Sequence, residues 1–145
     1  MAAPTGAGKT NIALLTILRE VGRFITEEAS AQKDYSMKHK SFCIIYIAPL
    51  KALASEIVDK FSSALSYLDI RVRELTGDMS MTKAEIQETH IIVATPEKWD
   101  VVTRKTDGMM NLVNCLILDE IHLLNDERGL VLECLVSRAL TTGFK

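Results

Sequence analysis

The sequence has few cysteines and no recognisable targeting or membrane segment. Its three cysteines, Cys43, Cys115 and Cys134, lack the paired spacing of a zinc site or redox pair, so we expect buried thiols in a reducing compartment. No apolar run approaches the roughly 18 residues of a membrane helix, and no signal-peptide pattern opens the chain. The net charge of −2 means that the chain as a whole has no excess of basic residues that would indicate a nucleic-acid partner. We therefore expect a soluble intracellular protein.

The 145 residues, 48% of them hydrophobic, can form the core of one globular domain. Four strand-like runs alternate with segments of helical periodicity, and residues 27–41 show neither pattern and predict a surface connection. The expected strands are 42–47, 70–75, 90–94 and 114–118, and the expected helices are about 9–25, 50–68, 82–88, a segment from 96 onwards, and 130–141. This alternation predicts an α/β fold with a mostly parallel sheet and helices on its faces, in which 70–75 is nearer an edge.

The string "APTGAGKT" at residues 3–10 predicts a phosphate-binding loop. Gly6 and Gly8 allow consecutive backbone amides to turn toward a phosphate, where a side chain would collide. Lys9 would place its ammonium on the terminal phosphates, and Thr10 its hydroxyl on Mg²⁺. The alternative is a glycine-rich turn that contains a lysine by chance. The expected cofactor-binding residues are Thr5, Gly6, Ala7, Gly8, Lys9 and Thr10.

Two carboxylates follow a hydrophobic run in "LILDEIH", residues 116–122. A parallel strand ending in Asp119 and Glu120 would deliver both groups to the ligand-binding edge of the sheet. One carboxylate could hold magnesium, and the other could orient and partly deprotonate the water that attacks a γ-phosphate. Taken alone, the pair could equally be a helix cap.

Three further stretches occupy expected strand ends: "APLKAL" at 48–53, "TGD" at 76–78 and "TPEKW" at 95–99. Each combines small or hydroxyl residues with a free helix N-terminus, which suits contact with a sugar-phosphate backbone. Each could also be an ordinary turn. Trp99 could stack on a base or lie in the core, and Arg104 and Lys105 could contact nucleic acid or form a solvated helix end.

Together these strings resemble motifs I, Ia, Ib, the following nucleic-acid motif and motif II of the first RecA-like lobe of a DExH-type superfamily 2 helicase. The longer strings "ELTGDM", "TPEKWDVVTRK" and "DEIHLLNDERG" narrow the resemblance to the large tandem-cassette branch. That branch includes the spliceosomal small nuclear ribonucleoprotein helicase and the helicase subunit of the activating signal cointegrator complex. The resemblance implies a RecA-like P-loop NTPase fold.

The resemblance also implies a role for each matching residue. It implies ATP and Mg²⁺ as cofactors, held by the loop named above, with Thr10 and Asp119 at the metal. It implies that Lys9, Asp119 and Glu120 are catalytic and that His122 couples hydrolysis to a second lobe. Without the resemblance, the position of His122 indicates an ordinary surface or core residue. The implied nucleic-acid contacts, in an enzyme that moves 3′ to 5′, are Pro49, Lys51, Thr76, Gly77, Thr95 and Pro96.

Set against the family pattern, residues 1–145 cover motifs I to II of the ATP-binding domain, so we expect a fold truncated at both ends, with the second RecA-like lobe absent. Without the arginines of that lobe we expect negligible ATPase activity from these residues alone. The implied partners are single-stranded RNA or DNA, the remaining helicase domains and a multiprotein complex, and no membrane is implied. The implied location is the nucleus or the cytoplasm, and the resemblance favours the nucleus. The alternative function is a non-catalytic nucleotide- or partner-binding fragment of such a helicase.

Overall fold

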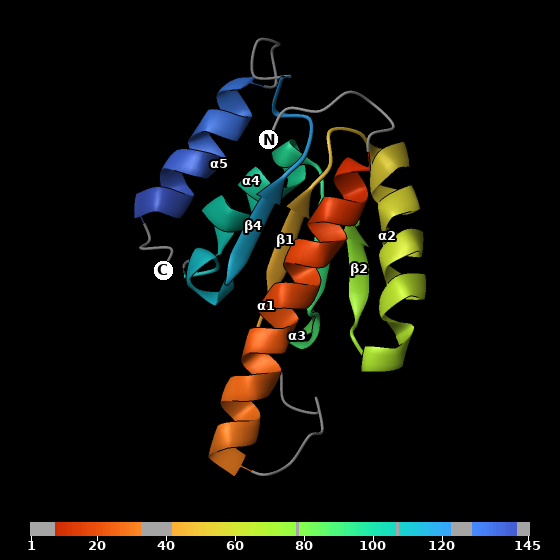
Figure 1. The fold of residues 1–145 in the computed structure, drawn as a ribbon. Helices are drawn as coiled ribbons and strands as arrows, with labels where there is room; N and C mark the ends of the chain where they lie inside the picture. The colour runs from red at the N-terminus through yellow and green to blue at the C-terminus, as the bar shows by residue number, and fades with distance from the viewer. Residues whose placement is uncertain (1–7, 33–41, 78, 107, 123–128, 142–145) are drawn as a thin grey trace.

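The computed structural model describes residues 8–32, 42–77, 79–106, 108–122 and 129–141. Within them, a parallel sheet lies between two layers of helices (Figure 1). The strands are β1 (Ile44–Ile47), β2 (Val72–Leu75), β3 (Ile91–Ala94) and β4 (Cys115–Leu118). The helices are α1 (Lys9–Gln32), α2 (Lys51–Leu65), α3 (Lys83–Glu88), α4 (Pro96–Lys105) and α5 (Gly129–Thr141), with 3₁₀ turns at Ser66–Leu68 and Met110–Leu112.

The strand order is β2-β3-β1-β4, and every pairing is parallel. Strand β1 lies between β3 and β4, so Tyr46 is level with Val93 on one side and with Ile117 on the other. Strand β2 lies at an edge of this sheet, as its partly alternating sequence predicted. Parallel pairing directs the carboxyl ends of all four strands to the same edge.

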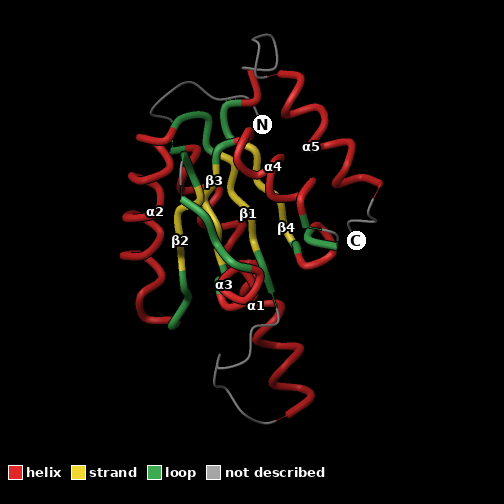
Figure 2. Tube along the Cα trace, turned by 180° about the vertical axis from the view of Figure 1, so that it is seen from behind, coloured by secondary structure: helices red, strands yellow, loops and turns green. Residues whose placement is uncertain are grey.

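Alternate residues of the buried strands face the two helical layers. Ile44 and Tyr46 of β1 pack in one apolar cluster with Ile17 of α1 and Phe61 of α2. Ile45 and Ile47 pack in a second cluster, with Ile86 of α3, Trp99 of α4 and Leu135 of α5. Figures 1 and 2 show these layers from opposite sides, which confirms the predicted α/β sheet with helices on both faces.

Helix α1 is longer than its apolar periodicity predicted. The segment 27–41 was expected to be a surface connection, but α1 continues to Gln32, and residues 33–41 lie outside the described residues. Glu, Ala and Gln dominate this extension, and it contains neither glycine nor proline, so its residue types favour continuation of the helix. Even at 24 residues α1 lacks the apolar character of a bilayer-crossing helix, as do the other described helices.

Two expectations about single side chains are settled by burial. Trp99 is 0% exposed within the α4 layer, so the base-stacking alternative is wrong and the core alternative is correct. The prediction of three buried thiols holds for Cys43, but Cys115 is only partly buried and Cys134 is exposed. Cys134 is exposed because Leu132 and Leu135 turn the neighbouring face of α5 toward the core.

Candidate nucleotide and nucleic-acid site

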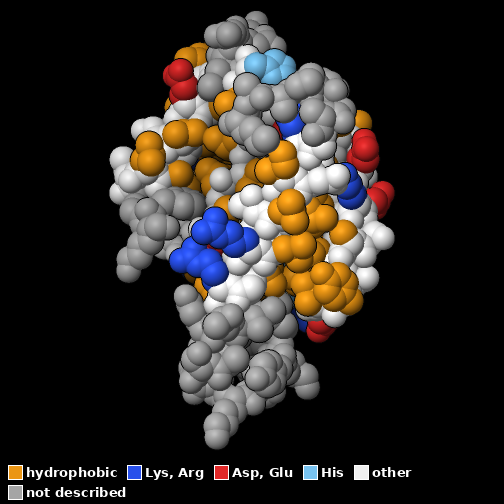
Figure 3. All heavy atoms as spheres, viewed as in Figure 1, with side chains coloured by type: hydrophobic (Ala, Val, Ile, Leu, Met, Phe, Trp, Pro, Cys, Tyr) orange, Lys and Arg blue, Asp and Glu red, His pale blue; other side chains and the backbone are white. Residues whose placement is uncertain are grey.

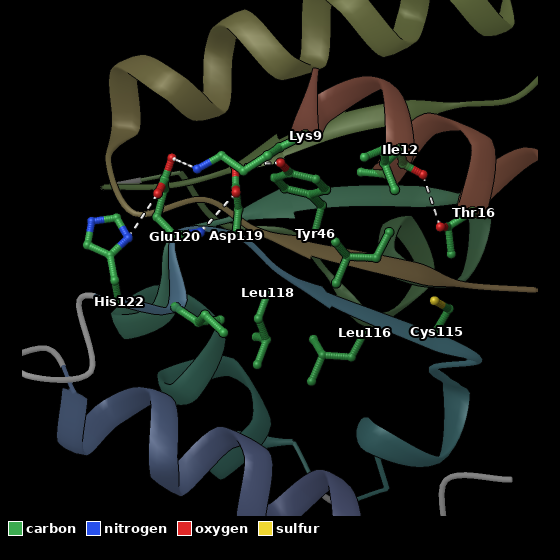
Figure 4. Close-up of a pocket in the computed structure, with 13 residues that line it drawn as sticks. Lys9, Ile12, Thr16, Tyr46, Cys115, Leu116, Leu118, Asp119, Glu120 and His122 are labelled. Atoms are coloured by element: carbon green, nitrogen blue, oxygen red, sulfur yellow. Dashed lines mark hydrogen bonds and ion pairs between the residues drawn. The ribbon is translucent and has the colours of Figure 1, made fainter. Parts of the chain in front are cut away.

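The described residues predicted for the nucleotide site lie at the carboxyl edge of the sheet or at the start of α1. Asp119 directly follows β4, and its amide donates to the Ile47 carbonyl at 3.1 Å, so the β1–β4 ladder continues to this residue. Lys9 comes from the start of α1, 110 positions earlier in the chain. The fold therefore brings the start of α1 and the residues that follow β4 together at one site, which Figure 4 shows in detail.

Glu120 is held between two basic side chains. Its Oε1 accepts a hydrogen bond from Lys9 Nζ at 2.9 Å, and its Oε2 lies 3.0 Å from His122 Nδ1. The Lys9 and Glu120 side chains are 27% and 21% exposed, so this ion pair is partly shielded from solvent, whereas the His122 side chain is 72% exposed. The expected catalytic lysine and catalytic base thus contact each other directly.

The backbone of Glu120 adopts a left-handed conformation, with φ of 51°. This region is unusual for a residue with a side chain and costs on the order of 1–3 kcal/mol. The strained turn comes directly after Asp119, whose Oδ1 accepts the Glu120 amide at 2.9 Å. The chain therefore turns between the two carboxylates, at the point where they leave the sheet.

A second contact to Asp119 comes from the neighbouring strand. The hydroxyl of Tyr46, on β1, donates a hydrogen bond to Asp119 Oδ2 at 2.7 Å. Burial raises the pKa of this hydroxyl well above its ordinary value, and the hydrogen bond to Asp119 raises it further. Tyr46 is consequently a neutral donor throughout the physiological pH range.

These groups form one end of a cavity of about 770 Å³. Mostly apolar side chains of α1, β4 and the residues after β4 form the rest of its wall, and Figure 3 shows hydrophobic side chains around a hollow between α1 and α5. The volume lies within the range of small-molecule sites in proteins. The lining residues are Lys9, Ile12, Ala13, Thr16, Tyr46, Cys115, Leu116, Ile117, Leu118, Asp119, Glu120, Ile121 and His122.

The described part of the phosphate loop has the backbone that its motif predicts. Gly8 has φ of 82°, a conformation that disfavours other residues, and its carbonyl accepts from the amides of Asn11 and Ile12 as α1 begins. Thr10 lies in the first turn, partly buried and outside the cavity lining. The remaining predicted loop residues, Thr5, Gly6 and Ala7, lie outside the described residues.

The donor set suits magnesium more than a tightly coordinated transition metal. Within the described residues, no group of three or more His, Cys, Asp or Glu side chains is arranged to hold a metal ion. Magnesium is commonly held by one or two carboxylates together with substrate phosphates and water. Asp119 and the Thr10 hydroxyl, in the first turn of α1, therefore fit a magnesium site that nucleotide phosphates complete.

The loops after β2 and β3 meet beside the start of α2. Lys98 of α4 donates through Nζ to the Gly77 carbonyl at 3.0 Å. Gly77 has φ of 55°, and a Cβ added to it would lie 3.7 Å from Lys51 Nζ, so the Lys51 side chain lies against this turn. Two lysines thus flank one glycine, and three predicted nucleic-acid stretches are joined into one surface.

The other predicted nucleic-acid residues differ in accessibility. Pro49, Thr76 and Pro96 are buried, and Thr95 is partly buried. The Thr76 side chain is 0% exposed and its hydroxyl donates to the Glu74 carboxylate, so this hydroxyl supports the turn from inside. Lys51 and Gly77 are the members of the predicted set that this structure leaves exposed.

Sequence reasoning did not assign Tyr46 or Lys98 individually. The sequence does indicate that Tyr46 needs a hydrogen-bond partner, because a tyrosine within the apolar run 42–47 is expected to be buried together with its hydroxyl. That the partner is Asp119 depends on the adjacency of β1 and β4. Lys98 was part of the quoted "TPEKW" string, but its contact with Gly77 spans 21 residues of sequence and could not be read locally.

Comparison with known families and folds agrees with this geometry. The sequence model described as "DEAD/DEAH box helicase" matches residues 1–142. The fold resembles the crystal structure of a hypothetical ATP-dependent RNA helicase from Sulfolobus tokodaii, with a TM-score of 0.67 over 93% of this chain and 36% of that chain. The identity is 21%, so this likeness concerns the fold, and it confirms the RecA-like expectation.

Curated relatives are much more similar in sequence. Activating signal cointegrator 1 complex subunit 3 of Dictyostelium discoideum is 59% identical over 97% of this chain, and pre-mRNA-splicing factor brr2 of Schizosaccharomyces pombe is 54% identical over 95%. In both cases the match covers 6% of the relative. The chain therefore spans a small part of the length of these relatives.

Proposed function

The chain belongs to the DEAD/DEAH box helicase family, and we propose that it is an ATP-binding portion of an ATP-dependent 3′-to-5′ nucleic-acid helicase. This membership and the two relatives confirm the resemblance to the large tandem-cassette helicases that the motifs predicted. The observation that carries the proposal is the 2.9 Å contact between Lys9 and Glu120, which unites the phosphate-loop lysine with the carboxylate pair.

In this proposal, ATP binds with its phosphates at the N-terminal end of α1. The first amides of a helix lack intrahelical partners and carry partial positive charge, so they stabilise an anion there. Lys9 would add its ammonium to the terminal phosphates. Thr10 and Asp119 would hold magnesium, which when bound supplies positive charge to the phosphate oxygens during transfer.

Glu120 would accept a proton from the attacking water. To do so it must leave Lys9, which would turn to the phosphates once a nucleotide is bound. His122 contacts the other carboxylate oxygen and is largely exposed, so it is placed to connect Glu120 to a part of the protein outside these residues. The proposed cycle therefore begins with the exchange of one ion pair for another.

The surface formed by Lys51, Gly77 and Lys98 would bind the sugar-phosphate backbone of a single strand. Lysine and backbone groups position such a strand without reading its bases. We favour RNA as the substrate, because one relative is named as a pre-mRNA-splicing factor. The other relative is named as a subunit of a complex, which supports action in a multiprotein complex inside the cell, and the resemblance favours the nucleus.

The nucleotide part of the proposal is tested by replacing Glu120 with glutamine. Because the substitution frees Lys9 from its ion pair, we expect the affinity for a fluorescent ATP analogue to rise by about two- to fivefold. Glu133→Gln, an exposed site on α5, makes the same charge change away from the cavity and should leave the affinity unchanged. Weaker binding by Glu120→Gln would contradict a competition between Glu120 and phosphate for Lys9.

The nucleic-acid part is tested by replacing Lys51 with alanine. We expect single-stranded RNA to bind several-fold more weakly, equally for unrelated sequences, with the slope of log affinity against log salt reduced by about 0.7. Lys60→Ala, on the exposed side of the same helix, is the matched control. Titrations at several salt concentrations measure both quantities, and an unchanged slope would remove Lys51 from the interface.

A further inference from the structure

Tyr46 is a buried polar residue inside the otherwise apolar strand β1. It is 1% exposed, and its ring packs edge-on against Phe61 of α2 with ring centroids 5.5 Å apart. It also lines the cavity, together with Lys9 and Asp119. The ring is therefore fixed by packing, while the hydroxyl reaches the site.

The hydroxyl limits the motion of Asp119. It donates to Asp119 Oδ2 at 2.7 Å, while Oδ1 accepts the Glu120 amide at 2.9 Å. Both carboxylate oxygens are thus held, one from a neighbouring strand and one from the following backbone, as Figure 4 shows. A carboxylate held at both oxygens cannot rotate freely about its Cβ–Cγ bond.

We propose that Tyr46 is a positioning residue that orients Asp119 for magnesium-dependent nucleotide binding. The inference rests on the proposed function and adds a residue from outside the phosphate loop and the Asp119–Glu120 pair. Mutation of a group that orients a metal-binding side chain typically costs about 10- to 100-fold in metal affinity. The remaining lone pairs of Asp119 stay available because each oxygen accepts one hydrogen bond in this arrangement.

The geometry separates this role from simple packing. The ring contacts Phe61 and the apolar cluster between β1, α1 and α2, whereas the hydroxyl contacts Asp119. A phenylalanine at this position would retain the ring and its packing. The Asp119 carboxylate would then keep one of its two described hydrogen bonds, the one from the Glu120 amide.

The test compares Tyr46→Phe with the wild-type chain by titrating a fluorescent ATP analogue with magnesium and, separately, with EDTA. We expect Tyr46→Phe to lose about 10-fold in affinity with magnesium and to change by less than about twofold in EDTA. Tyr67→Phe, whose tyrosine is 72% exposed, is the matched control. A purely structural role would move the affinity in both media.

A double-mutant cycle with Asp119→Asn establishes that Tyr46 acts through Asp119. In the Asp119→Asn background, Tyr46→Phe should have little further effect on the magnesium dependence. Equal magnesium dependence in wild type and Tyr46→Phe would overturn the inference and leave the proposed function standing. The same holds if the effects of Tyr46→Phe and Asp119→Asn simply add in the double mutant. A wild-type chain that binds no nucleotide in either medium would overturn the proposed function and the inference together. Should Tyr46→Phe fail to fold by circular dichroism, the hydroxyl would be structural and the inference wrong.

Discussion

We expect Lys9→Ala to lower the affinity of the chain for ATP by about 10- to 100-fold, because the substitution removes a charged hydrogen bond to phosphate. Lys9 lines the cavity and is already directed toward its acidic end by Glu120. The substitution removes the ammonium that would contact the phosphates, which lowers the affinity. It also removes the ion pair with Glu120 that competes with phosphate in the free chain, which offsets a small part of the loss because such a pair contributes little.

Isothermal titration with ATP and magnesium measures this loss directly. Lys60→Ala, at an exposed position on α2, is the matched control for removal of one positive charge. Because Lys60 lies outside the cavity lining, its variant should bind as the wild type does. Binding by Lys9→Ala within twofold of wild type would show that the string "APTGAGKT" is a glycine-rich turn and not a phosphate site.

We expect Arg138→Ala to destabilise the folded chain by about 3 kcal/mol, because it removes the inner partner of a buried carboxylate. The Asp100 side chain, on α4, is 3% exposed and accepts from Arg138 Nη2 at 3.0 Å. The same guanidinium donates to the Thr103 hydroxyl, so one side chain of α5 satisfies two groups of α4. Loss of Arg138 leaves a buried charge with less compensation and also loosens α5 from α4.

Arg104 provides the internal comparison. It also pairs with Asp100, four residues earlier on α4, but its side chain is 65% exposed. Because the Arg104 side chain is mostly in water, its charge is screened by solvent, and Arg104→Ala should cost less than about 1 kcal/mol. Urea unfolding curves measure both variants. Equal small losses would mean that Asp100 is satisfied without Arg138, and equal large losses would mean that the exposed pair matters as much as the inner one.

Arg104 also answers a question that its sequence position left open. The alternatives were a nucleic-acid contact and a solvated helix end. The side chain is largely exposed but paired with Asp100, which favours the second alternative, since the ion pair occupies part of its donor set. The pattern of charges along α4 could not distinguish these alternatives, because the burial of Asp100 depends on α5.

Most of the element order was predictable because its signals are local. The apolar runs and helical spacings identified each described strand and helix, with boundaries that moved by a few residues. The main error was the end of α1, where an amphipathic pattern fades although the residue types still favour a helix. Periodicity reports which face is buried, so it becomes uninformative where a helix leaves the core.

The candidate site was predictable to the level of its motifs. Glycine at position 8 with positive φ, a lysine at the start of α1 and two carboxylates after β4 follow from residue types and spacing. Their placement at one edge follows from parallel strands, a consequence of strand and helix alternation. The roles of these residues remain predictions for the experiments above.

Local chemistry along the chain was therefore enough to identify the α/β class, the carboxyl-edge site and the phosphate-loop candidates. Tertiary structure alone decided the order β2-β3-β1-β4, and with it the contact of Tyr46 with Asp119. It also decided that Trp99 is core and that Lys98 reaches Gly77. The physical reason is that periodicity and motif spacing are properties of neighbouring residues, whereas these contacts exist only after distant strands and helices pack side by side.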